Sequence, residues 1–311
     1  MSSMISIDGL TKRFGPFTAV DNISFSVGSG EVLGFLGPNG AGKSTTMKMV
    51  TGYLPITAGS ASVCGFDVVN QSLDARKKVG YLPEGAPLYG DMSGLAFLNF
   101  IAEIRGFSGS EKKQRVDQAI EKLQLQSVIN KPIDTLSKGF KRRVGLAQAI
   151  LHDPDVLILD EPTDGLDPNQ KHQVRTLIKE MASDKAIVIS THLLEEVSAV
   201  CTRAVVIAQG RIVFDGSPEE LSAKSPVHNA VTIKLTADAT DGIKSDLQGI
   251  AEVDRIETVN GGNSLLVVPK DGAQIIEKVS LLVRDKGIEV DELYVERGHL
   301  DQVFRELTLS A

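Results

Sequence analysis

The feature that most constrains this chain is a glycine-rich segment that fits the pattern G-x-x-x-x-G-K-[ST]: Gly37-Pro38-Asn39-Gly40-Ala41-Gly42-Lys43-Ser44-Thr45. A short apolar run, 32–36, precedes it and predicts a strand, and residues 44–50 predict a helix after it. A strand, a glycine loop and a helix in this order predict a nucleotide-phosphate site in an α/β domain. The pattern alone does not separate kinases, GTPases and motors.

The chemistry of phosphate binding explains the residue types in this loop. Gly37, Gly40 and Gly42 allow backbone N–H groups to turn inward toward an anion. The helix that follows points its positive N-terminus at the same anion. Lys43 places a cation on the β- and γ-phosphates, and the hydroxyl of Ser44 can ligate Mg²⁺. The other positions of the loop are expected to contact the nucleotide as well: Pro38, Asn39, Ala41 and Thr45.

Two acidic residues end an apolar strand further along the chain. Residues 156–159 form the apolar run, and Asp160 and Glu161 follow at once. A strand buried on both faces excludes carboxylates from its interior, but ligands gather at the carboxyl ends of strands in an α/β sheet. Asp160 is expected to hold Mg²⁺, and Glu161 to accept the proton of the attacking water. His192 follows the next strand, 186–190, from where an imidazole can reach the γ-phosphate.

Apolar periodicity divides the chain into regions. Residues 5–27 alternate apolar runs with turn residues and predict antiparallel strands. Helical spacing of apolar residues runs from about 93 to 151. Three β-branched runs predict buried parallel strands, the last followed by a hairpin turn at Gln209-Gly210: 156–159, 187–189 and 205–207. After a break at 216–226, the element order βαββαβ of residues 227–311 matches a small ferredoxin-like α+β domain.

Charge and apolar content restrict the partners. The 311 residues carry a net charge of −7, which argues against nucleic acid, because nucleic-acid-binding surfaces usually carry a basic excess. No apolar run approaches the ~20 residues that a membrane helix needs. If the protein serves a membrane process, another chain must cross the membrane.

One further motif lies about twenty residues before the carboxylate strand: Leu136-Ser137-Lys138-Gly139-Phe140, followed by Arg142-Arg143-Val144-Gly145-Leu146-Ala147. It resembles the signature motif of ABC ATPases, usually written LSGGQ, from which Lys138 and Phe140 depart. The resemblance implies that Ser137 and Gly139 bind the γ-phosphate held by the phosphate loop of a second copy. Taken alone, Ser137 is an N-cap of a helix, and the two roles are compatible.

Other landmarks of the ABC ATPases occur in the same order over residues 4–222. Phe14 matches the aromatic residue that stacks on adenine, although a core position is the alternative. Asp167, in Gly165-Leu166-Asp167, matches the loop that couples the two sites across the dimer. Glu84 stands where most members have Gln, which contacts Mg²⁺ and senses the membrane partner. The resemblance thus implies ATP and Mg²⁺ as ligands, with Ser44, Asp160 and Glu84 at the metal and Glu161 and His192 as catalytic residues.

The resemblance also implies a fold. Residues 1–222 are expected to form the P-loop NTPase fold of ABC ATPases, with a mixed sheet core, an antiparallel β subdomain and a helical subdomain at about 86–152. Residues 227–311 are left as an accessory domain. Glu84, Lys138 and the closing segment most resemble the ATPases of ABC-2 type exporters; that segment reads Leu300-Asp301-Gln302-Val303-Phe304-Arg305-Glu306-Leu307-Thr308.

The implied function is that of an ATP-hydrolysing subunit, which forms a homodimer around two ATP molecules and drives separate integral-membrane permease subunits, with export favoured over import. Such a protein is cytoplasmic and lies on the inner face of the cell membrane through its permease. Two alternatives stay open: a non-transport ABC ATPase acting on the ribosome or DNA, and a regulatory protein that uses ATP only as a switch. A single cassette, the Asp160-Glu161 pair and His192 favour the transporter ATPase.

Overall fold

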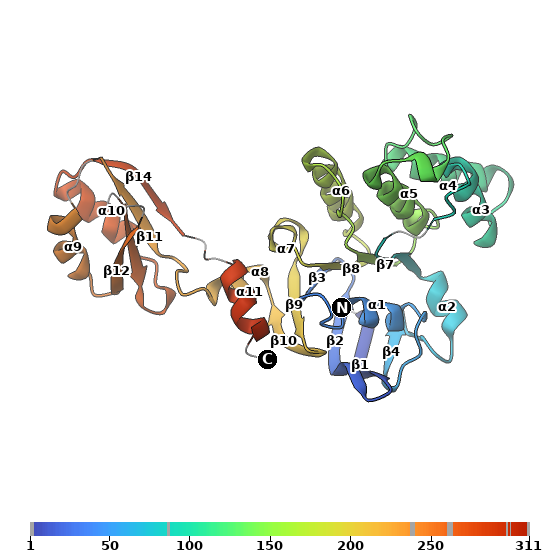
Figure 1. The fold of residues 1–311 in the computed structure, drawn as a ribbon, viewed down its shortest axis with the longest axis horizontal. Helices are drawn as coiled ribbons and strands as arrows, with labels where there is room; N and C mark the ends of the chain where they lie inside the picture. Colours follow the sequence, from blue (N-terminus) through green and yellow to red (C-terminus); the bar gives the residue numbers. More distant parts are fainter. Residues whose placement is uncertain are drawn as a thin grey trace. The chain divides into compact units, whose positions relative to one another are not determined.

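The computed structural model describes residues 3–85, 88–236, 240–259, 264–296, 298 and 300–309. The chain forms two compact units, Met1–Gly216 and Ser217–Ser310 (Figure 1). We expected the first domain to extend to residue 222. The division falls earlier because helix α8 (Pro218–Ala223) packs against α11 (Leu300–Leu309) in the second unit. The expected domain ends at residues 1 and 311, and the expected start of the helical subdomain at residue 86, lie outside the described residues.

A six-stranded sheet forms the centre of the first unit, in the order β10-β9-β3-β8-β7-β6. Five of its strands are parallel: β3 (Val32–Leu36), β6 (Val79–Leu82), β7 (Val156–Asp160), β8 (Ala186–Thr191) and β9 (Arg203–Ala208). Strand β10 (Arg211–Gly216) is antiparallel to β9. Gln209 and Gly210 join these two strands, both with left-handed backbone, as a tight hairpin turn requires. The predicted parallel strands and the predicted hairpin are confirmed.

A second, antiparallel sheet has the order β2-β1-β4-β5. Its strands are β1 (Ser3–Phe14), β2 (Phe17–Gly28), β4 (Ala58–Val63) and β5 (Phe66–Asp67). Helix α1 (Lys43–Val50) contacts β2, β4 and β7, so it lies between the two sheets. The sequence predicted the strands before residue 28, whereas β4 and β5 were not foreseen.

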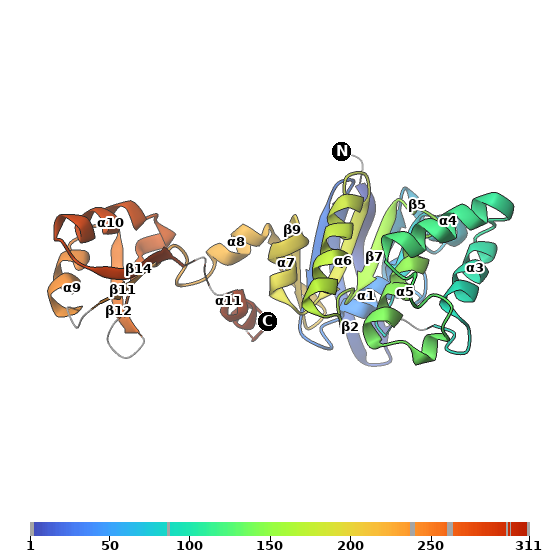
Figure 2. The same ribbon diagram turned by 90° about the horizontal axis from the view of Figure 1, so that it is seen from above.

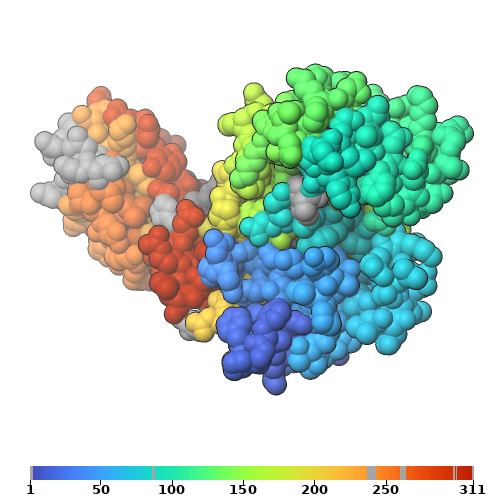
Figure 3. Space-filling view, turned by 45° about the vertical axis from the view of Figure 1, so that its right-hand side comes forward, coloured from blue at the N-terminus to red at the C-terminus, as the bar shows by residue number. Residues whose placement is uncertain are grey.

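Three helices gather at one end of the first unit and form its helical part: α3 (Gly94–Ile104), α4 (Gly109–Lys122) and α5 (Lys138–Ile150) (Figure 2). Figure 3 shows this helical part in green beside the antiparallel sheet in blue. Helix α2 (Ser72–Lys77) connects β5 of the antiparallel sheet to β6 of the central sheet, and α6 (Pro168–Met181) and α7 (Leu194–Val200) connect strands of the central sheet. Among the described residues, no helix combines the length and the apolar composition needed to cross a membrane.

The central sheet separates two hydrophobic cores, because successive side chains of a strand point to opposite faces. Val156 and Ile158 of β7 belong to the core shared with α1 and the antiparallel sheet. Leu157 and Leu159 belong to the core shared with the helical part and α6. Burial on both faces explains the continuous apolar run, and it leaves the first polar side chains of this strand at its carboxyl end.

The second unit contains a four-stranded sheet in the order β12-β13-β11-β14, with all neighbours antiparallel. Its elements are β11 (Val231–Leu235), α9 (Thr240–Gln248), β12 (Val253–Val259), β13 (Ser264–Pro269), α10 (Ile276–Asp285) and β14 (Val290–Val295). Ile233 and Val267 of the sheet share a core with Leu247 and Val279 of the helices. The predicted element order is confirmed, and the strand order is that of a ferredoxin-like fold.

Candidate functional site

A cavity of about 430 Å³ opens where the phosphate loop meets the carboxyl ends of the central strands. Strand β3 ends at Leu36, and the phosphate loop leads directly into α1 at Lys43. Twelve residues line the cavity: Phe14, Phe17, Ala19, Asn39, Gly40, Gly42, Lys43, Ser44, Thr45, Glu84, Asp160 and Glu161. The structure therefore brings ten of the predicted site residues to one cavity, from segments widely separated in the sequence.

Two loop positions require glycine for different reasons. Gly42 has φ 109°, a backbone region that other residues rarely adopt, and a Cβ there would lie 2.6 Å from the carbonyl oxygen of Ala19. Gly37 has ordinary backbone angles, but a Cβ would lie 2.4 Å from the carbonyl oxygen of Ile207. Close packing against neighbouring strands therefore sets the path of the loop. Gly37, Pro38 and Ala41 shape this path without lining the cavity.

The side chain of Lys43 is buried against the phosphate loop. Its Nζ donates to the carbonyl oxygens of Gly37 at 2.6 Å and Pro38 at 3.1 Å. Burial lowers the pKa of Lys43, while the negative charges of Glu161, Asp160 and Glu84 act in the opposite direction. An anion bound in the loop would further stabilise the charged ammonium, so this environment suits a phosphate.

Asp160 carries the chemistry expected of a metal-binding carboxylate. It is 1% exposed, its Oδ1 accepts a hydrogen bond from the hydroxyl of Ser190, and its Oδ2 is buried without a hydrogen-bond partner. An unpaired buried oxygen is costly, and a cation would satisfy it. Ser44 and Glu84 add oxygen atoms to the same cavity. Among the described residues, no three acidic, histidine or cysteine side chains form a ready metal cage. These residues fit Mg²⁺, which is usually held by few carboxylates together with phosphate and water.

Glu161 is held from three directions. Its N–H donates to the carbonyl oxygen of Ser190 at 2.9 Å, and its Oε1 lies 2.8 Å from Nδ1 of His192. Its backbone has φ 53°, a left-handed conformation that costs a non-glycine residue about 1–3 kcal/mol. The surrounding structure maintains this conformation and turns the carboxylate into the cavity. His192 does not line the cavity itself, but it contacts the residue expected to act as the base.

Arg142 provides the third constraint, which the sequence interpretation missed. This guanidinium from α5 is 5% exposed. Its Nε donates to the carbonyl oxygen of Glu161 at 2.9 Å, and its Nη1 to that of Pro83 at 2.9 Å. Its Nη2 contacts the carbonyl oxygens of Asp160 and Glu161. The only signal in the sequence is an arginine pair inside a helix with an apolar face, and this signal does not identify the partners.

The aromatic side of the cavity holds two rings. Phe14 and Phe17 face each other across the turn between β1 and β2, and both are exposed. This exposure rules out the core position considered for Phe14. The Nζ of Lys12 lies 5.0 Å from the centre of the Phe14 ring and donates to the carbonyl oxygen of Pro55 at 2.7 Å. Two exposed rings beside a phosphate loop suit stacking on a nucleotide base. Phe17 was not foreseen.

The signature residues lie elsewhere on the same chain. Ser137 is the N-cap of α5 and accepts a hydrogen bond from the N–H of Phe140 at 3.3 Å, which confirms the cap. Lys138 forms an ion pair with Asp164 at 2.8 Å, and this hydrogen bond lowers the pKa of the Asp164 carboxyl. A Cβ on Gly139 would lie 2.6 Å from the Gln170 side chain. Ser137 and Gly139 do not line the cavity of their own chain.

Asp167 has a structural partner in this chain. It is the N-cap of α6, and its side chain accepts a hydrogen bond from the N–H of Gln170 at 2.9 Å. Like the signature residues, Asp167 does not line the cavity. The structure thus separates the predicted residues into two sets. Residues of the phosphate loop and the carboxylates line one cavity, and Ser137, Gly139 and Asp167 lie outside it.

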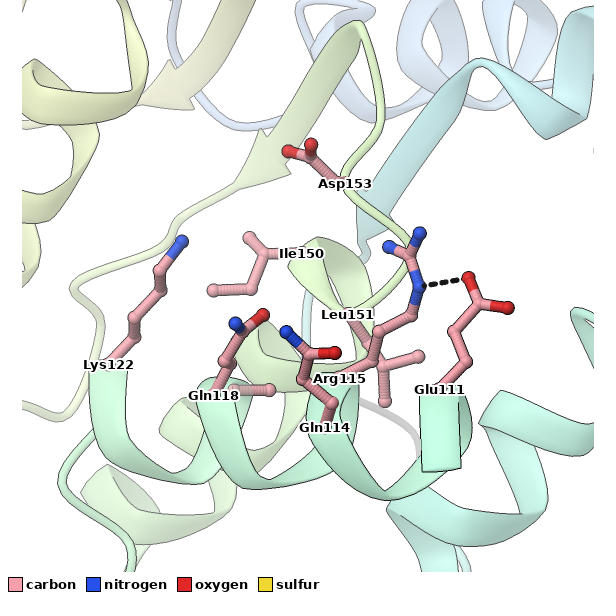
Figure 4. A pocket seen from close by; sticks show the side chains of 9 residues that line it. Glu111, Gln114, Arg115, Gln118, Lys122, Ile150, Leu151 and Asp153 are labelled. Atoms are coloured by element: carbon pink, nitrogen blue, oxygen red, sulfur yellow. Dashed lines mark hydrogen bonds and ion pairs between the residues drawn. The ribbon is translucent and has the colours of Figure 1, made fainter. Parts of the chain in front are cut away.

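Another hollow, of about 340 Å³, lies between α4 and the end of α5 (Figure 4). Its lining carries two positive and two negative side chains. Arg115 donates to Glu111 at 3.1 Å, and Lys122 and Asp153 are the other charged pair of residues. A balanced lining offers no net attraction to a triphosphate. The hollow also lacks the phosphate loop and the carboxylates, so we place the nucleotide site at the first cavity.

The fold and this cavity define a P-loop nucleoside triphosphatase: a phosphate loop on a parallel sheet, with paired acids at the end of a nearby strand. Comparisons with known proteins name the family. The ABC transporter family matches residues 20–164. The chain is 31% identical over 306 residues to the Nod factor export ATP-binding protein I of Ralstonia nicotianae, covering 98% of this chain and 94% of that protein. The chain therefore belongs to the ABC transporter family as an ATP-binding subunit, a class of proteins that hydrolyse ATP.

Two further relatives extend this comparison. The chain is 37% identical over 224 residues to the probable multidrug ABC transporter ATP-binding protein YbhF of Escherichia coli, covering 72% of this chain and 39% of that protein. The match thus spans about two fifths of the length of YbhF. Among solved structures, cbiO1 from Clostridium perfringens, part of the ABC transporter complex cbiONQ, has a TM-score of 0.64 at 28% identity. That match covers 72% of this chain and 92% of cbiO1.

Proposed function

We propose that this protein hydrolyses ATP as a homodimer and that the resulting opening and closing drives separate permease subunits in a membrane. The observation that carries the chemistry is the convergence of Lys43, Asp160 and Glu161 on one cavity. The loop and Lys43 hold the triphosphate, and Phe14 stacks on the base. Glu161 accepts a proton from a water molecule while the oxygen of that water attacks the γ-phosphorus. The bond from the γ-phosphorus to the bridging oxygen breaks, giving ADP and phosphate, and His192 keeps the Glu161 carboxylate in position.

Magnesium would be held by Ser44, Asp160 and Glu84. When bound, Mg²⁺ neutralises charge on the β- and γ-phosphate oxygens. The buried, unpaired Oδ2 of Asp160 supports this assignment. Glu84 adds a negative charge where most relatives carry a neutral amide, which would strengthen the attraction for the cation.

The homodimer explains the position of the signature residues. Ser137 caps the N-terminus of a 13-residue helix, and such an end attracts anions. It does not line the cavity of its own chain, so a second copy must supply the triphosphate that it contacts. A two-fold symmetric pair would close two sites with the same contacts. Loss of the γ-phosphate removes the bridge between the copies, and the pair opens.

An exposed apolar surface of the first unit supports a permease contact. A hollow of about 200 Å³ is lined by Thr51, Gly52, Tyr53, Arg76, Val79, Tyr81 and Arg105. Tyr53 in this lining is 74% exposed, and Leu73 and Ile104, close in sequence to the lining residues Arg76 and Arg105, are 68% and 65% exposed. Exposed apolar residues gathered in this way are typical of protein contacts. Strand β6 lines the hollow and leads to Glu84 at the ATP cavity, so a rigid strand connects the two places.

The direction of transport rests on the relatives. YbhF is named as a probable multidrug transporter protein, and the Ralstonia protein as a Nod factor export protein. We infer export through an ABC-2 type permease, with this chain bound to the cytoplasmic face of the membrane through that permease. A nucleic-acid partner is not part of this proposal, in keeping with the net charge of −7.

The test is a pull-down from gently solubilised membranes, with bound chains identified by mass spectrometry. We expect a stoichiometric multi-helix membrane protein with the wild-type chain. The double variant Tyr53→Glu/Ile104→Glu should lose it, because two charges would have to be buried in the contact. Leu281→Glu changes an exposed apolar residue of the second unit and should retain it. Recovery of ribosomes or DNA-repair proteins instead, or of a soluble regulatory target, would overturn the transport function.

A further inference from the structure

We propose that Arg142 is a positioning residue for hydrolysis, which ties the signature helix α5 to the backbone of the catalytic Glu161 and so links the two ATP sites of the dimer. The linking part of this inference rests on the proposed dimer. The positioning part concerns a single chain and stands on the contacts of Arg142 alone.

The guanidinium of Arg142 donates its hydrogen bonds to backbone carbonyl oxygens. Its donors reach three carbonyl oxygens, those of Pro83, Asp160 and Glu161. Within the described part of the chain, no ion pair joins Arg142 to a carboxylate. A guanidinium offers five donors on three nitrogens in a rigid fork, so it can bridge carbonyls that a lysine, with its single nitrogen, cannot span. Arg142 therefore fixes where the ends of β6 and β7 lie relative to α5.

The carbonyl of Glu161 belongs to the residue whose side chain does the chemistry. The N–H of Glu161 donates to the carbonyl oxygen of Ser190, and its carboxylate contacts His192. Its carbonyl oxygen accepts from Arg142 at 2.9 Å and from the N–H of Asp164 at 3.1 Å. The left-handed backbone of Glu161 needs support from outside. Without the guanidinium, this carbonyl is left with the bond from Asp164, so the peptide after Glu161 turns more easily and the carboxylate shifts relative to the attacking water.

Helix α5 carries residues for both sites. Ser137 lies five positions before Arg142, a rise of about 7.5 Å along a helix. A second side chain of α5, Gln148, donates its Nε2 to the carbonyl oxygen of Tyr81 at 2.7 Å. The helix is thus tied to β6 and β7 at two points. A shift of its N-terminus, where Ser137 would meet the triphosphate of the second copy, moves Arg142 and the Glu161 backbone as well.

The same helix contains a matched control. Arg143 is 6% exposed, nearly as buried as Arg142. Its Nη1 donates to the carbonyl oxygen of Leu123 at 3.2 Å, and its guanidinium lies 4.3 Å from the centre of the Phe140 ring. Leu123 is the C-cap of α4 and Phe140 lies in α5, so both of these contacts of Arg143 lie within the helical part. A general loss of stability on removing a buried arginine would therefore appear with either residue.

The experiment measures phosphate release against ATP concentration for the wild type, Arg142→Lys, Arg142→Gln and Arg143→Lys, with folding checked by thermal melting. We expect Arg142→Lys to lower kcat roughly 10²-fold, the usual result of a small misplacement at a reacting centre, with KM changed less than about threefold. A lysine donates from a single nitrogen and cannot span the three carbonyls that the guanidinium joins, and the shorter Arg142→Gln should be no better. Arg143→Lys should keep the wild-type kcat.

The dependence on ATP concentration tests the link between the sites. We expect a Hill coefficient above 1 for the wild type and for Arg143→Lys, and a value near 1 for Arg142→Lys. If the wild type is cooperative and Arg142→Lys keeps both its kcat and its cooperativity, the inference is wrong while the proposed dimer stands. Equal losses in Arg142→Lys and Arg143→Lys would reduce Arg142 to a stabilising residue. A wild-type coefficient of 1 with full turnover would overturn the link between the sites, and kcat alone would then decide the positioning role.

Discussion

The Nδ1 atom of His192 lies 2.8 Å from Oε1 of Glu161, although 31 positions separate the two residues in the chain. The contact exists because β7 and β8 are parallel neighbours whose carboxyl ends meet at the same edge of the sheet. It places an imidazole behind a carboxylate that already faces the phosphate loop. This pair organises the chemistry that the mutations below address.

Replacing Glu161 by Gln tests the general base. Glutamine has the same shape and cannot take up the proton, so we expect phosphate release to fall roughly 10²–10⁴-fold while ATP still binds. ATP should then hold the two copies together, and the dimer should accumulate in size-exclusion chromatography with ATP. Glu180→Gln, on the exposed face of α6, should behave like the wild type. Normal hydrolysis by Glu161→Gln would remove Glu161 from its role.

Mixed dimers test whether the second copy completes the site. Lys43→Ala removes the cation that binds the phosphates, and Ser137→Arg blocks the N-terminus of α5. Each homodimer should therefore be nearly inactive. In a mixed dimer, both defects meet in one site and the other site is intact. We expect phosphate release to recover on mixing, because each mixed dimer keeps one intact site and should work at up to half of the wild-type rate. If mixing restores nothing although heterodimers form, Ser137 does not act on the other copy.

Comparing ATP with inorganic triphosphate, which has no base, tests whether Phe14 and Phe17 stack on the adenine. Base stacking on an aromatic side chain contributes about 1–3 kcal/mol, so Phe14→Ala should weaken ATP binding about tenfold or more. Phe17→Ala should weaken it as well, since Phe17 lines the same cavity. Binding of inorganic triphosphate, measured by calorimetry, should not change in either variant. Equal losses for ATP and triphosphate would mean that the loop was disturbed and that the rings do not stack.

His152 predicts a dependence of stability on pH. Its Nε2 lies 3.1 Å from Val79 O, and burial, with Arg105 nearby, lowers its pKa from 6.5 to about 4. Between pH 6.5 and pH 4 the unfolded chain binds a proton at His152 that the folded chain does not. The free energy of unfolding therefore has its highest value above pH 6.5 and falls as the pH drops toward 4. The loss between pH 7 and pH 5 should be about 2 kcal/mol.

Urea unfolding followed by circular dichroism measures this loss. His152→Gln does not titrate and keeps a donor for Val79 O, so its stability should change about 2 kcal/mol less than that of the wild type between the two pH values. His172→Gln replaces an exposed histidine of α6 and should keep the wild-type dependence. An unchanged pH dependence in His152→Gln would show that other groups cause it.

Much of the fold could be predicted because its signals are local. The apolar run at Val156 and the two acids after it describe a buried strand and its carboxyl end within six residues. The glycines of the phosphate loop carry the same kind of information, as do the alternating patterns of the second unit. Strands β4 and β5 escaped prediction, because Ala58–Val63 is small and polar and Phe66–Asp67 has two residues. The pairing of β4 with β1 depends on a partner distant in sequence, and β5 pairs in turn with β4.

What the sequence by itself determined is the chemical equipment: a phosphate loop with Lys43, paired acids at a strand end and a signature serine at a helix start. Only the tertiary structure decided how this equipment is held. It aligned His192 with Glu161, kept Glu161 in a left-handed conformation and placed Arg142 on three carbonyl oxygens. The reason is physical: every residue has the same backbone carbonyl, so the residue types do not reveal which carbonyls a buried arginine will meet. That choice belongs to the packing of α5 against β6 and β7.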